Sequence, residues 1–442
     1  GTAPLHLAES PAEVNRPVLC YSYDEAVKAF GYSKDWKKYT LCEAVYSQFA
    51  IYGHGPVVLV NVLDPGKHRE STENQSISFT GGKAVITEPV MLGTLKVRAL
   101  EAGEPLKRDE DYTAEYDDDE ELVITALEGG ALEGKGSAFV SYDALKPDQV
   151  TKEDIIGGID TSTGKSKGLE TIDQVFPLFG LVPGLILAPG WSHIPEVAAI
   201  MKAKALNINE HFKAMVIADV PTDEVKKYTD VSTWKNKNGY TGENEIVCWP
   251  MVKMGDKVYH MSTHVMGVIA SVDADNEDIP YESPSNKSMS INGLCLKDGS
   301  EVIMGPEQAN YLNGQGIVTA LNFIGGCYPS NTDAKDAFIS IKRMFYWHAQ
   351  TFIQTYWVKV DKPITKRLIQ TVIDSENIRL NGLVAQGVLL GARVEFLESE
   401  NPTTNLLDGK IKFHTYFTPP APAREIDNVI EYDTGYFNSL FG

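Results

Sequence analysis

Residues 184–221 constrain the fold more than any other part of the chain. The stretches "GLILAPG" and "KAMVIADVP" are short, apolar and strand-like, and "IPEVAAIMKAKALNIN" lies between them. Pro195 stands near the start of the middle stretch, as is common in the first turn of a helix. Four apolar residues of that stretch follow at helical spacing, namely Val197, Ile200, Met201 and Leu206. A strand, a helix and a second strand predict a parallel sheet with crossover helices.

The remaining segments predict further domains around this sheet, as expected for a chain of 442 residues. Helical and strand-like stretches also alternate near the start, where "GPVVLVNVL" is typical of a strand buried on both faces. Short strand-like stretches such as "TLKVRAL" and "ELVITAL" then follow between turns and predict a small β-sandwich. Later, "KDAFISIKRMFYWHAQTFIQTYW" and "ITKRLIQTVIDSENIRLNGL" predict two helices. The predicted domains are residues 1–63 (α/β), 64–150 (β-sandwich), 151–330 (α/β) and 331–442 (α+β).

The charge of the chain excludes some classes of partner. The net charge of −20 argues against binding to nucleic acid, whose phosphates require a basic surface. No apolar run has the roughly 20 residues that span a bilayer, so we expect no membrane segment. Residues 64–150 hold 19 acidic and 9 basic side chains, whereas residues 338–395 hold 4 acidic and 8 basic ones. This asymmetry suggests surfaces that face different surroundings.

The motifs that could carry chemistry are incomplete. In "GGIDTSTGKSKG", one residue too many separates the glycines of a phosphate-binding loop, so a surface turn is the better interpretation. In "APGWSH", Ile194 replaces the second glycine of a nucleophile elbow, and we interpret Ser192 as a helix N-cap. His260 and His264 lack the glutamate of a zinc-protease motif. The acidic run 117–121 is interpreted as a solvated turn, and the five widely spaced cysteines as buried free thiols. We therefore predict no catalytic residues, metal or cofactor.

The end of the chain carries an additional strand-like segment. "KIKFHTYFT" at residues 410–418 predicts a strand in which Ile411, Phe413, Thr415 and Phe417 share one face. The prolines of "TPPAPAR" then favour an extended spacer. Beyond them, Ile426, Ile430 and Tyr432 alternate with acidic residues, which predicts a second strand. It could return to its own sheet or pair with another subunit.

Several long stretches together resemble the tail sheath proteins of contractile bacteriophages and phage-tail-like bacteriocins. The resemblance rests on "GTAP", "YGHGPVVLVNVLDP", "LFGLVPGLILAPGWSH", "EQANYLNGQGIVTALNFIGG", "DSENIRLNGL" and "DGKIKFHTYFTPPAPAREIDNVIEY", and it covers essentially the whole chain. It implies a subtilisin-like α/β core without protease residues, an inserted β-sandwich on the outside, and a C-terminal domain that lines the sheath. The implied function is structural: subunits polymerise around an inner tube and contract to drive it through the target envelope.

The resemblance also implies partners, a location and roles for residues. The partners are other copies of the chain, the tube protein, and baseplate and tail terminator proteins, in a virion tail assembled in the cytoplasm of the bacterial host. The linking arm occupies about residues 418–442, and its expected strand consists of Glu425, Ile426, Asp427, Asn428, Val429, Ile430, Glu431 and Tyr432. The expected receiving hairpin contains Arg393, Val394, Glu395, Phe396, Ile411, Lys412, Phe413, His414 and Thr415. The candidates to face an acidic tube are Lys342, Arg343, Lys366, Arg367, Arg379 and Arg393.

The sequence departs from the family pattern at two places. The family has further residues before "GTAP", including an N-terminal arm, and it has a loop with Trp and Arg where "NFIGG" here runs into "CYPSNTD". The second departure predicts a break between Gly326 and Cys327.

Two alternative functions stay open. The first is a hydrolase or NTPase on the α/β domain, which would need a clustered catalytic set. The second is a monomeric β-sandwich adhesin, whose last strand would pair within its own chain.

Overall fold

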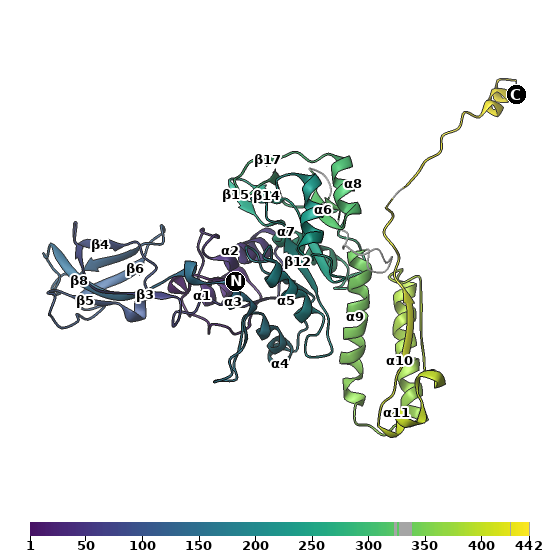
Figure 1. The fold of residues 1–442 in the computed structure, drawn as a ribbon, viewed down its shortest axis with the longest axis horizontal. Helices are drawn as coiled ribbons and strands as arrows, with labels where there is room; N and C mark the ends of the chain where they lie inside the picture. The colour runs from purple at the N-terminus through teal and green to yellow at the C-terminus, as the bar shows by residue number, and fades with distance from the viewer. Residues whose placement is uncertain (322–324, 327–337, 425, 442) are drawn as a thin grey trace. The chain divides into compact units, whose positions relative to one another are not determined.

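A computed structural model describes residues 1–321, 325–326, 338–424 and 426–441. The predicted break between Gly326 and Cys327 lies outside the described residues. The chain divides into two compact units, Gly1–Lys362 and Pro363–Gly442 (Figure 1). The four predicted domain boundaries stay predictions, although the helix α9 (Ile339–Tyr356) is grouped with the first unit.

The centre of the first unit is a mixed five-stranded sheet in the order β11-β12-β13-β18-β19. Its first four strands are parallel and β19 is antiparallel to β18. The strands are β11 (Leu185–Leu187), β12 (Met215–Asp219), β13 (Glu245–Cys248), β18 (Ile317–Ala320) and β19 (Gly325–Gly326). The parallel strand–helix–strand arrangement predicted for residues 184–221 is therefore confirmed, with α5 (Pro195–Ala205) as its helix.

Helices cover both faces of this sheet because its strands are apolar on both sides. All five residues of β12 are buried. Met215 and Ile217 pack in one core with Val265 of α7 (Met261–Asp275). Val216, on the other face, packs in a second core with α5. The remaining helices of this unit are α1 (Tyr23–Phe30), α2 (Thr40–Val45), α3 (Lys152–Ile156), α4 (Val175–Phe179), α6 (Tyr228–Lys237) and α8 (Pro306–Gly314).

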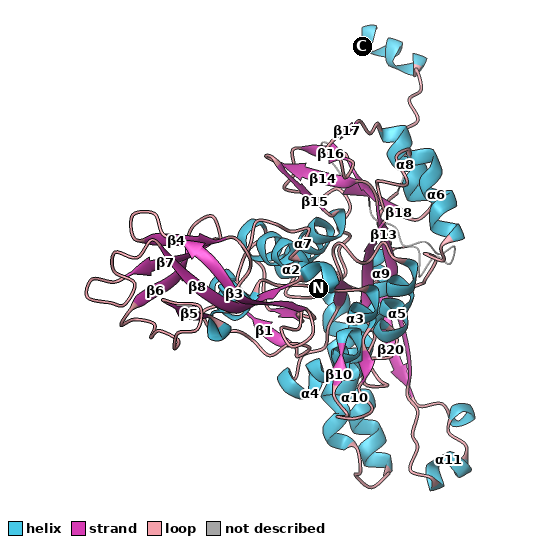
Figure 2. Cartoon of the chain, turned by 60° about the vertical axis from the view of Figure 1, so that its left-hand side comes forward, coloured by secondary structure: helices cyan, strands magenta, loops and turns pink. Residues whose placement is uncertain are grey.

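Two three-stranded antiparallel sheets share one core within residues 69–145 (Figure 2). The first has the order β3-β8-β5 and the second β4-β7-β6. These strands are β3 (Arg69–Ser78), β4 (Lys83–Ile86), β5 (Lys96–Arg98), β6 (Tyr112–Tyr116), β7 (Leu122–Ala126) and β8 (Ser137–Leu145). In the acidic run, the carboxylate of Asp117 accepts the backbone N–H groups of Asp119 and Glu121, as expected for a solvated turn.

The described part of the first unit also contains three smaller sheets. β1 (Val18–Cys20) pairs antiparallel with β2 (Val57–Leu59), where the sequence predicted a strand buried on both faces. Val57 and Val58, whose side chains point to opposite faces of the strand, are in fact half-buried, so the prediction of a strand buried on both faces is wrong. A four-stranded sheet contains β14 (Met251–Met254), β15 (Lys257–Tyr259), β16 (Gly293–Cys295) and β17 (Glu301–Val302). A hairpin of β9 (Gly158–Ile159) and β10 (Ser166–Lys167) forms the glycine-rich turn.

The second unit contains the helix α10 (Lys366–Ala385) and a two-stranded hairpin. The hairpin pairs β20 (Gly391–Glu395) antiparallel with β21 (His414–Thr418), and Val394 lies opposite Thr415. The short helix α11 (Thr403–Leu407) lies in the connection between the two strands. The predicted strand at 410–418 is thus shorter than expected, because it begins only at His414.

Of the helices in the described part of the chain, none combines the length and the apolar character that a bilayer span requires.

Candidate functional site

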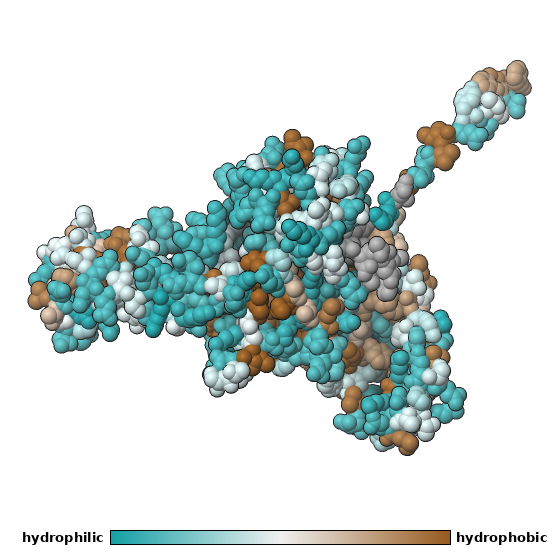
Figure 3. Space-filling view, viewed as in Figure 1, coloured by the Kyte–Doolittle hydropathy of each residue, from teal (hydrophilic) through white to brown (hydrophobic). Residues whose placement is uncertain are grey.

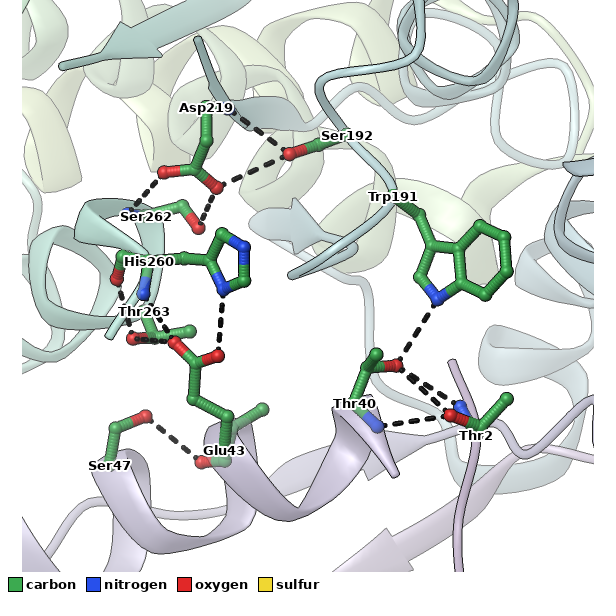
Figure 4. A network of polar contacts seen from close by, with 11 residues as sticks. Thr2, Thr40, Glu43, Ser47, Trp191, Ser192, Asp219, His260, Ser262 and Thr263 are labelled. Atoms are coloured by element: carbon green, nitrogen blue, oxygen red, sulfur yellow. Dashed lines mark hydrogen bonds and ion pairs between the residues drawn. The ribbon is translucent and has the colours of Figure 1, made fainter. Parts of the chain in front are cut away.

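A buried polar network at the carboxyl end of β12 is the place where an enzyme on this fold would be sought. The carboxylate of Asp219 accepts the backbone N–H of Ser262 at 2.9 Å and its hydroxyl at 2.5 Å. The hydroxyl of Ser192 donates to the same carboxylate at 3.3 Å and accepts the N–H of Asp219 at 3.1 Å (Figure 4). These bonds hold Ser192 inside the protein, where it is 1% exposed.

The interpretation of Ser192 as a helix N-cap is therefore wrong. The N-cap of α5 is Ile194, and the side chain of Ser192 binds the end of β12 instead. The reason is tertiary, because a buried strand end offers the hydroxyl both an N–H donor and a carboxylate acceptor. Burial also raises the pKa of Asp219 by desolvation, against the opposing charge of His260 and the bonds from Ser262.

His260 and Glu43 form the second half of this network. Nδ1 of His260 lies 2.7 Å from one carboxylate oxygen of Glu43, and the backbone N–H of His260 donates to the other at 2.6 Å. The hydroxyl of Thr263 donates to Glu43 at 3.2 Å. Desolvation lowers the pKa of His260, but Glu43 and then Asp219 outweigh it and raise the pKa to about 9. The imidazole is therefore protonated near neutral pH.

This network has the residue types of a hydrolase but not the required arrangement. A nucleophilic serine needs a neutral base that can take its proton and a path for the substrate. Here His260 is charged and Ser192 is bonded to Asp219 in a buried position. Among the described residues, no group of three or more His, Cys, Asp or Glu side chains is placed to hold a metal ion. The network joins α2, β12 and the start of α7.

The glycine-rich turn between β9 and β10 also binds its own residues. The carboxylate of Asp160 accepts the backbone N–H groups of Ser162 at 3.0 Å and Thr163 at 3.2 Å. Lys167 donates to the same carboxylate at 2.8 Å. A phosphate would need those N–H groups free. The prediction of a surface turn is confirmed.

The hairpin of the second unit has two strands, and within the described residues each has the other as its one neighbouring strand. The side-chain amide of Asn377 on α10 accepts the N–H of Val394 at 2.9 Å and donates to its C=O at 3.2 Å. This amide occupies part of the outer edge of β20. The guanidinium of Arg393 lies 4.0 Å from the centroid of the Tyr416 ring on the opposite strand. The outer edge of β20 is therefore partly covered at Val394.

A second asparagine explains why β21 starts late. The amide of Asn401 accepts the N–H of Lys412 at 2.7 Å and donates to its C=O at 2.9 Å. Because these bonds occupy the backbone N–H and C=O of Lys412, this residue does not pair with β20. The strand β21 therefore begins only at His414, after Ile411 and Phe413. Phe413 instead packs its ring 5.9 Å from that of Phe396.

The terminal segment is extended and exposed, but residues 426–432 form no strand in this structure. The alternative in which this segment returns to its own sheet is therefore not seen among the described residues. Pairing with another subunit stays a prediction, because a strand is stable only when another one satisfies its backbone groups. The apolar residues of the segment are almost fully exposed, with Ile426 at 88%, Val429 at 90%, Ile430 at 87% and Tyr432 at 75%. Asp427, Asn428 and Glu431 are exposed beside them, and Glu425 lies outside the described residues. Figure 1 draws the segment as an extended trace.

The six basic candidates occupy different environments. Lys342 is buried and its Nζ lies 2.9 Å from Glu243, while Arg343 donates to Asp273 at 2.8 Å. Arg379 is paired with Glu376, and Arg393 with Glu395 at 2.7 Å. Lys366 and Arg367 are exposed in the first turn of α10. The role of all six at a tube stays a prediction.

Sequence reasoning missed Glu43, Asn377 and Asn401. Glu43 offered a signal, because it is a charged residue in the otherwise apolar stretch "LCEAV". The two asparagines offered none, since each binds backbone groups more than ten residues away.

Comparison with known proteins assigns the class of the molecule. A tail sheath protein of Burkholderia phage BcepMu is 25% identical over 466 aligned residues, which cover 100% of this chain and 93% of that protein. A putative prophage major tail sheath protein of Pseudomonas aeruginosa (strain UCBPP-PA14) is 25% identical over 64% of this chain and 73% of its own length. The tail sheath protein of Escherichia phage P2 is 23% identical over 62% of this chain and 69% of its own length. No protein-family model matches the chain.

The fold has a counterpart among solved structures. The cryo-EM structure of an extracellular contractile injection system, the PVC sheath complex in the contracted state, matches 61% of this chain and 76% of its own with a TM-score of 0.50 and 16% identity. That likeness concerns the fold, which is mixed α/β. The homologues place the chain among the structural proteins of contractile tails. Within that class they support a contractile tail sheath protein, a structural subunit of the sheath.

Proposed function

We propose that this chain polymerises with its own copies into a sheath around an inner tube, and that contraction of the sheath drives the tube through the target cell envelope. The observation that supports this proposal best is the terminal segment 426–432. It is extended, apolar at Ile426, Val429, Ile430 and Tyr432, and exposed at all four. Isolated proteins rarely leave such a segment uncovered unless a partner binds it.

The proposed partner is the hairpin β20–β21 of a neighbouring subunit. An extended segment can add to an open sheet edge, where backbone hydrogen bonds supply affinity and alternate side chains fix the register. Burying about four apolar side chains yields roughly 6–12 kcal/mol. Ordering about ten residues costs on the order of 10 kcal/mol. One arm is therefore marginal, and stable linkage needs many arms acting together in a polymer.

The α/β centre of the first unit is, in this proposal, a subtilisin-like scaffold without enzymatic activity. The buried network around Asp219 supports that assignment, because its serines are bonded to the strand end rather than presented to a substrate. The proposed function needs no metal, cofactor or nucleic acid. The further partners are the tube, baseplate and tail terminator proteins, in a virion tail or a phage-tail-like particle assembled in the cytoplasm of the bacterial host.

Electron microscopy of the purified chain over a range of concentrations tests the proposal, with a variant that ends at Arg424 as the comparison. We expect rings or tubes of uniform diameter from the full chain and none from the shortened one. Circular dichroism spectra of the two unassembled proteins should agree closely, since the regular structure in the described part of the removed segment is the short 3-10 helix Thr434–Leu440. Equal assembly of both proteins would contradict the role of the segment.

A further inference from the structure

The two-sheet region, residues 69–145, is joined to the rest of the first unit at one place. Both connecting segments leave from there, because Arg69 at the start of β3 is paired with Leu145 at the end of β8. Next to this place, Nε2 of His68 lies 3.3 Å from the carboxylate of Asp154 on α3. These two segments tether the region, and other contacts decide whether its remainder lies against the unit.

A second set of contacts lies at the end of β6 and in the turn that follows it. The carboxylate of Glu120 in this turn accepts the backbone N–H of Lys34 at 3.1 Å. The ring of Tyr116, the last residue of β6, lies 5.3 Å from the imidazole of His6 in an edge-on arrangement. Because His6 and Lys34 belong to the N-terminal segment, both contacts cross from the two-sheet region to the rest of the unit.

The imidazole of His6 is enclosed by aromatic rings from both parts. It is 7% exposed, and its ring also lies 5.8 Å from that of Tyr39. Its Nδ1 is buried and has no hydrogen-bond partner among the described residues. The hydroxyl of Tyr116 donates instead to the C=O of Val90 at 2.6 Å. A proton on Nδ1 would therefore add a charge where no described group accepts its hydrogen bond, which is costly in a buried place.

The groups around His6 do not stabilise that charge. Burial raises the pKa of both tyrosines, which are therefore neutral near neutral pH. The charges of Glu120 and Asp35 act on Tyr39, and Glu120 is bonded to Lys34. Desolvation alone determines the pKa of His6 and lowers it to about 3. The contact thus requires the neutral imidazole.

We propose that His6 is an acid-sensitive switch, whose protonation makes the two-sheet region swing away from the N-terminal segment about its tether. The swing separates Tyr116 from His6 and Glu120 from Lys34, and water then solvates the imidazolium. Figure 3 shows a mostly hydrophilic surface over this region, at the left of the view, which suits a part that moves through water. This inference concerns the first unit and does not depend on the proposed function.

The direction of the effect follows from the two environments of the imidazole. The pKa of His6 is about 3 in the closed arrangement and returns to 6.5 once the ring meets water. Above pH 6.5 the ring is neutral in both arrangements, so pH has little effect through this group. Between pH 6.5 and 3 a proton binds to the open arrangement only. The ratio of open to closed molecules should therefore rise about 70-fold from pH 7 to pH 4.5.

Distances between pairs of spin labels, measured by electron paramagnetic resonance, test the swing. One pair joins Lys83 on β4 to Lys237 on α6, and the control pair joins Lys28 on α1 to Lys237. All three side chains are exposed, and labels on an unnatural amino acid leave the cysteines unchanged. At pH 4.5 we expect the first pair to gain a longer distance and the control pair to keep its own. No longer distance, or a change in both pairs, would overturn the proposal.

His6→Phe is the matched variant, because it keeps an aromatic ring in contact with both tyrosines but cannot bind a proton. It should stay closed at pH 4.5, and the control pair of labels reports whether it folds. Glu120 and His68 are unchanged in this variant, so any opening caused by their titration would persist in it. Opening of the variant to the same extent as the original chain would overturn the role of His6.

Hydrogen exchange at the amide of Lys34 detects the opening even when few molecules are open. Its N–H is bonded to Glu120 across the contact, so it exchanges when the two parts separate. Relative to the intrinsic exchange rate at each pH, we expect exchange to become about 70-fold faster from pH 7 to pH 4.5 in the original chain. In His6→Phe it should stay constant. Equal acceleration in both proteins, or none in the original chain, would overturn the proposal.

Discussion

The imidazole of His260 is bound to the carboxylate of Glu43 although the two residues are 217 positions apart in the chain. Nδ1 of His260 lies 2.7 Å from Glu43 Oε2, and the backbone N–H of His260 lies 2.6 Å from Oε1. His260 is the N-cap residue of α7, and Glu43 lies on α2. The pair therefore holds the N-terminal segment against the sheet that forms the centre of the first unit.

Replacement of Glu43 by glutamine should destabilise the first unit strongly. The amide keeps the shape of the side chain but leaves the imidazolium of His260 without its hydrogen-bonded counter-charge in a largely buried position. Breaking such a pair costs about 3 kcal/mol, to be measured by chemical denaturation. Glu13→Gln is the matched control, because Glu13 pairs with Arg16 on the exposed surface. That change should cost less than about 0.5 kcal/mol, and an equal cost for both would contradict this account.

The stability of the protein should depend on pH through His260. Its pKa is about 9 in the folded protein and 6.5 in the unfolded chain, so folding favours the protonated form. The stabilisation is complete below pH 6.5 and is lost as pH rises through 9. The measurement is the difference in free energy of unfolding between the original chain and His260→Gln at each pH, which removes the contributions of other groups. A difference that stays constant from pH 6 to 10 would refute the ion pair.

Asn401→Ala should loosen the start of β21. The amide of Asn401 is buried and makes both hydrogen bonds to the backbone of Lys412. The amide also donates to the C=O of Leu397, so its loss leaves three backbone groups without these bonds and should cost about 1–3 kcal/mol in the second unit. Hydrogen exchange at Lys412 and His414 should accelerate. Asn405→Ala, at an exposed position on α11, is the control and should leave both amides unchanged.

Ile430→Asp should weaken assembly without affecting the fold. Ile430 is 87% exposed, so the change removes no contact within the subunit, but it places a charge where the proposed strand must be buried. We expect sedimentation velocity to show loss of polymer, with the unfolding temperature unchanged. Thr434→Asp adds the same charge at an exposed position just beyond the expected strand and should assemble. Assembly by both variants would argue against strand donation.

Charge reversal at Lys366 and Arg367 should prevent co-assembly with the tube protein while the sheath still polymerises. These two residues are exposed in the first turn of α10, so their replacement by glutamate changes the surface charge only. The same change at Lys342 or Arg343 would break ion pairs with Glu243 or Asp273 and destabilise the fold. Co-sedimentation with the tube protein measures the effect. Lys83→Glu, exposed on β4, is the control, and unchanged tube binding by the double variant would refute the prediction.

Local periodicity explains which parts of the fold were predictable. The apolar spacing of residues 195–205 and 215–219 gave the helix α5 and the strand β12, because side-chain alternation along a single segment determines which face can be buried. The same reasoning found the strand β21, although it begins later than predicted. The hairpin that pairs it with β20 was implied by the family resemblance. It also rejected the phosphate loop, whose glycine spacing is a local property.

The sequence by itself therefore determined the α/β pattern, the turns and the apolar terminal segment. Only the tertiary structure decided that Ser192 binds the end of β12, that Glu43 pairs with His260, and that Asn401 delays β21 to His414. It also decided that Val57 and Val58 face a groove and that residues 426–432 stay unpaired within the chain. The physical reason is the same in each case. A polar group or a strand edge must find its partner across space, and the spacing of neighbouring residues does not encode where that partner lies.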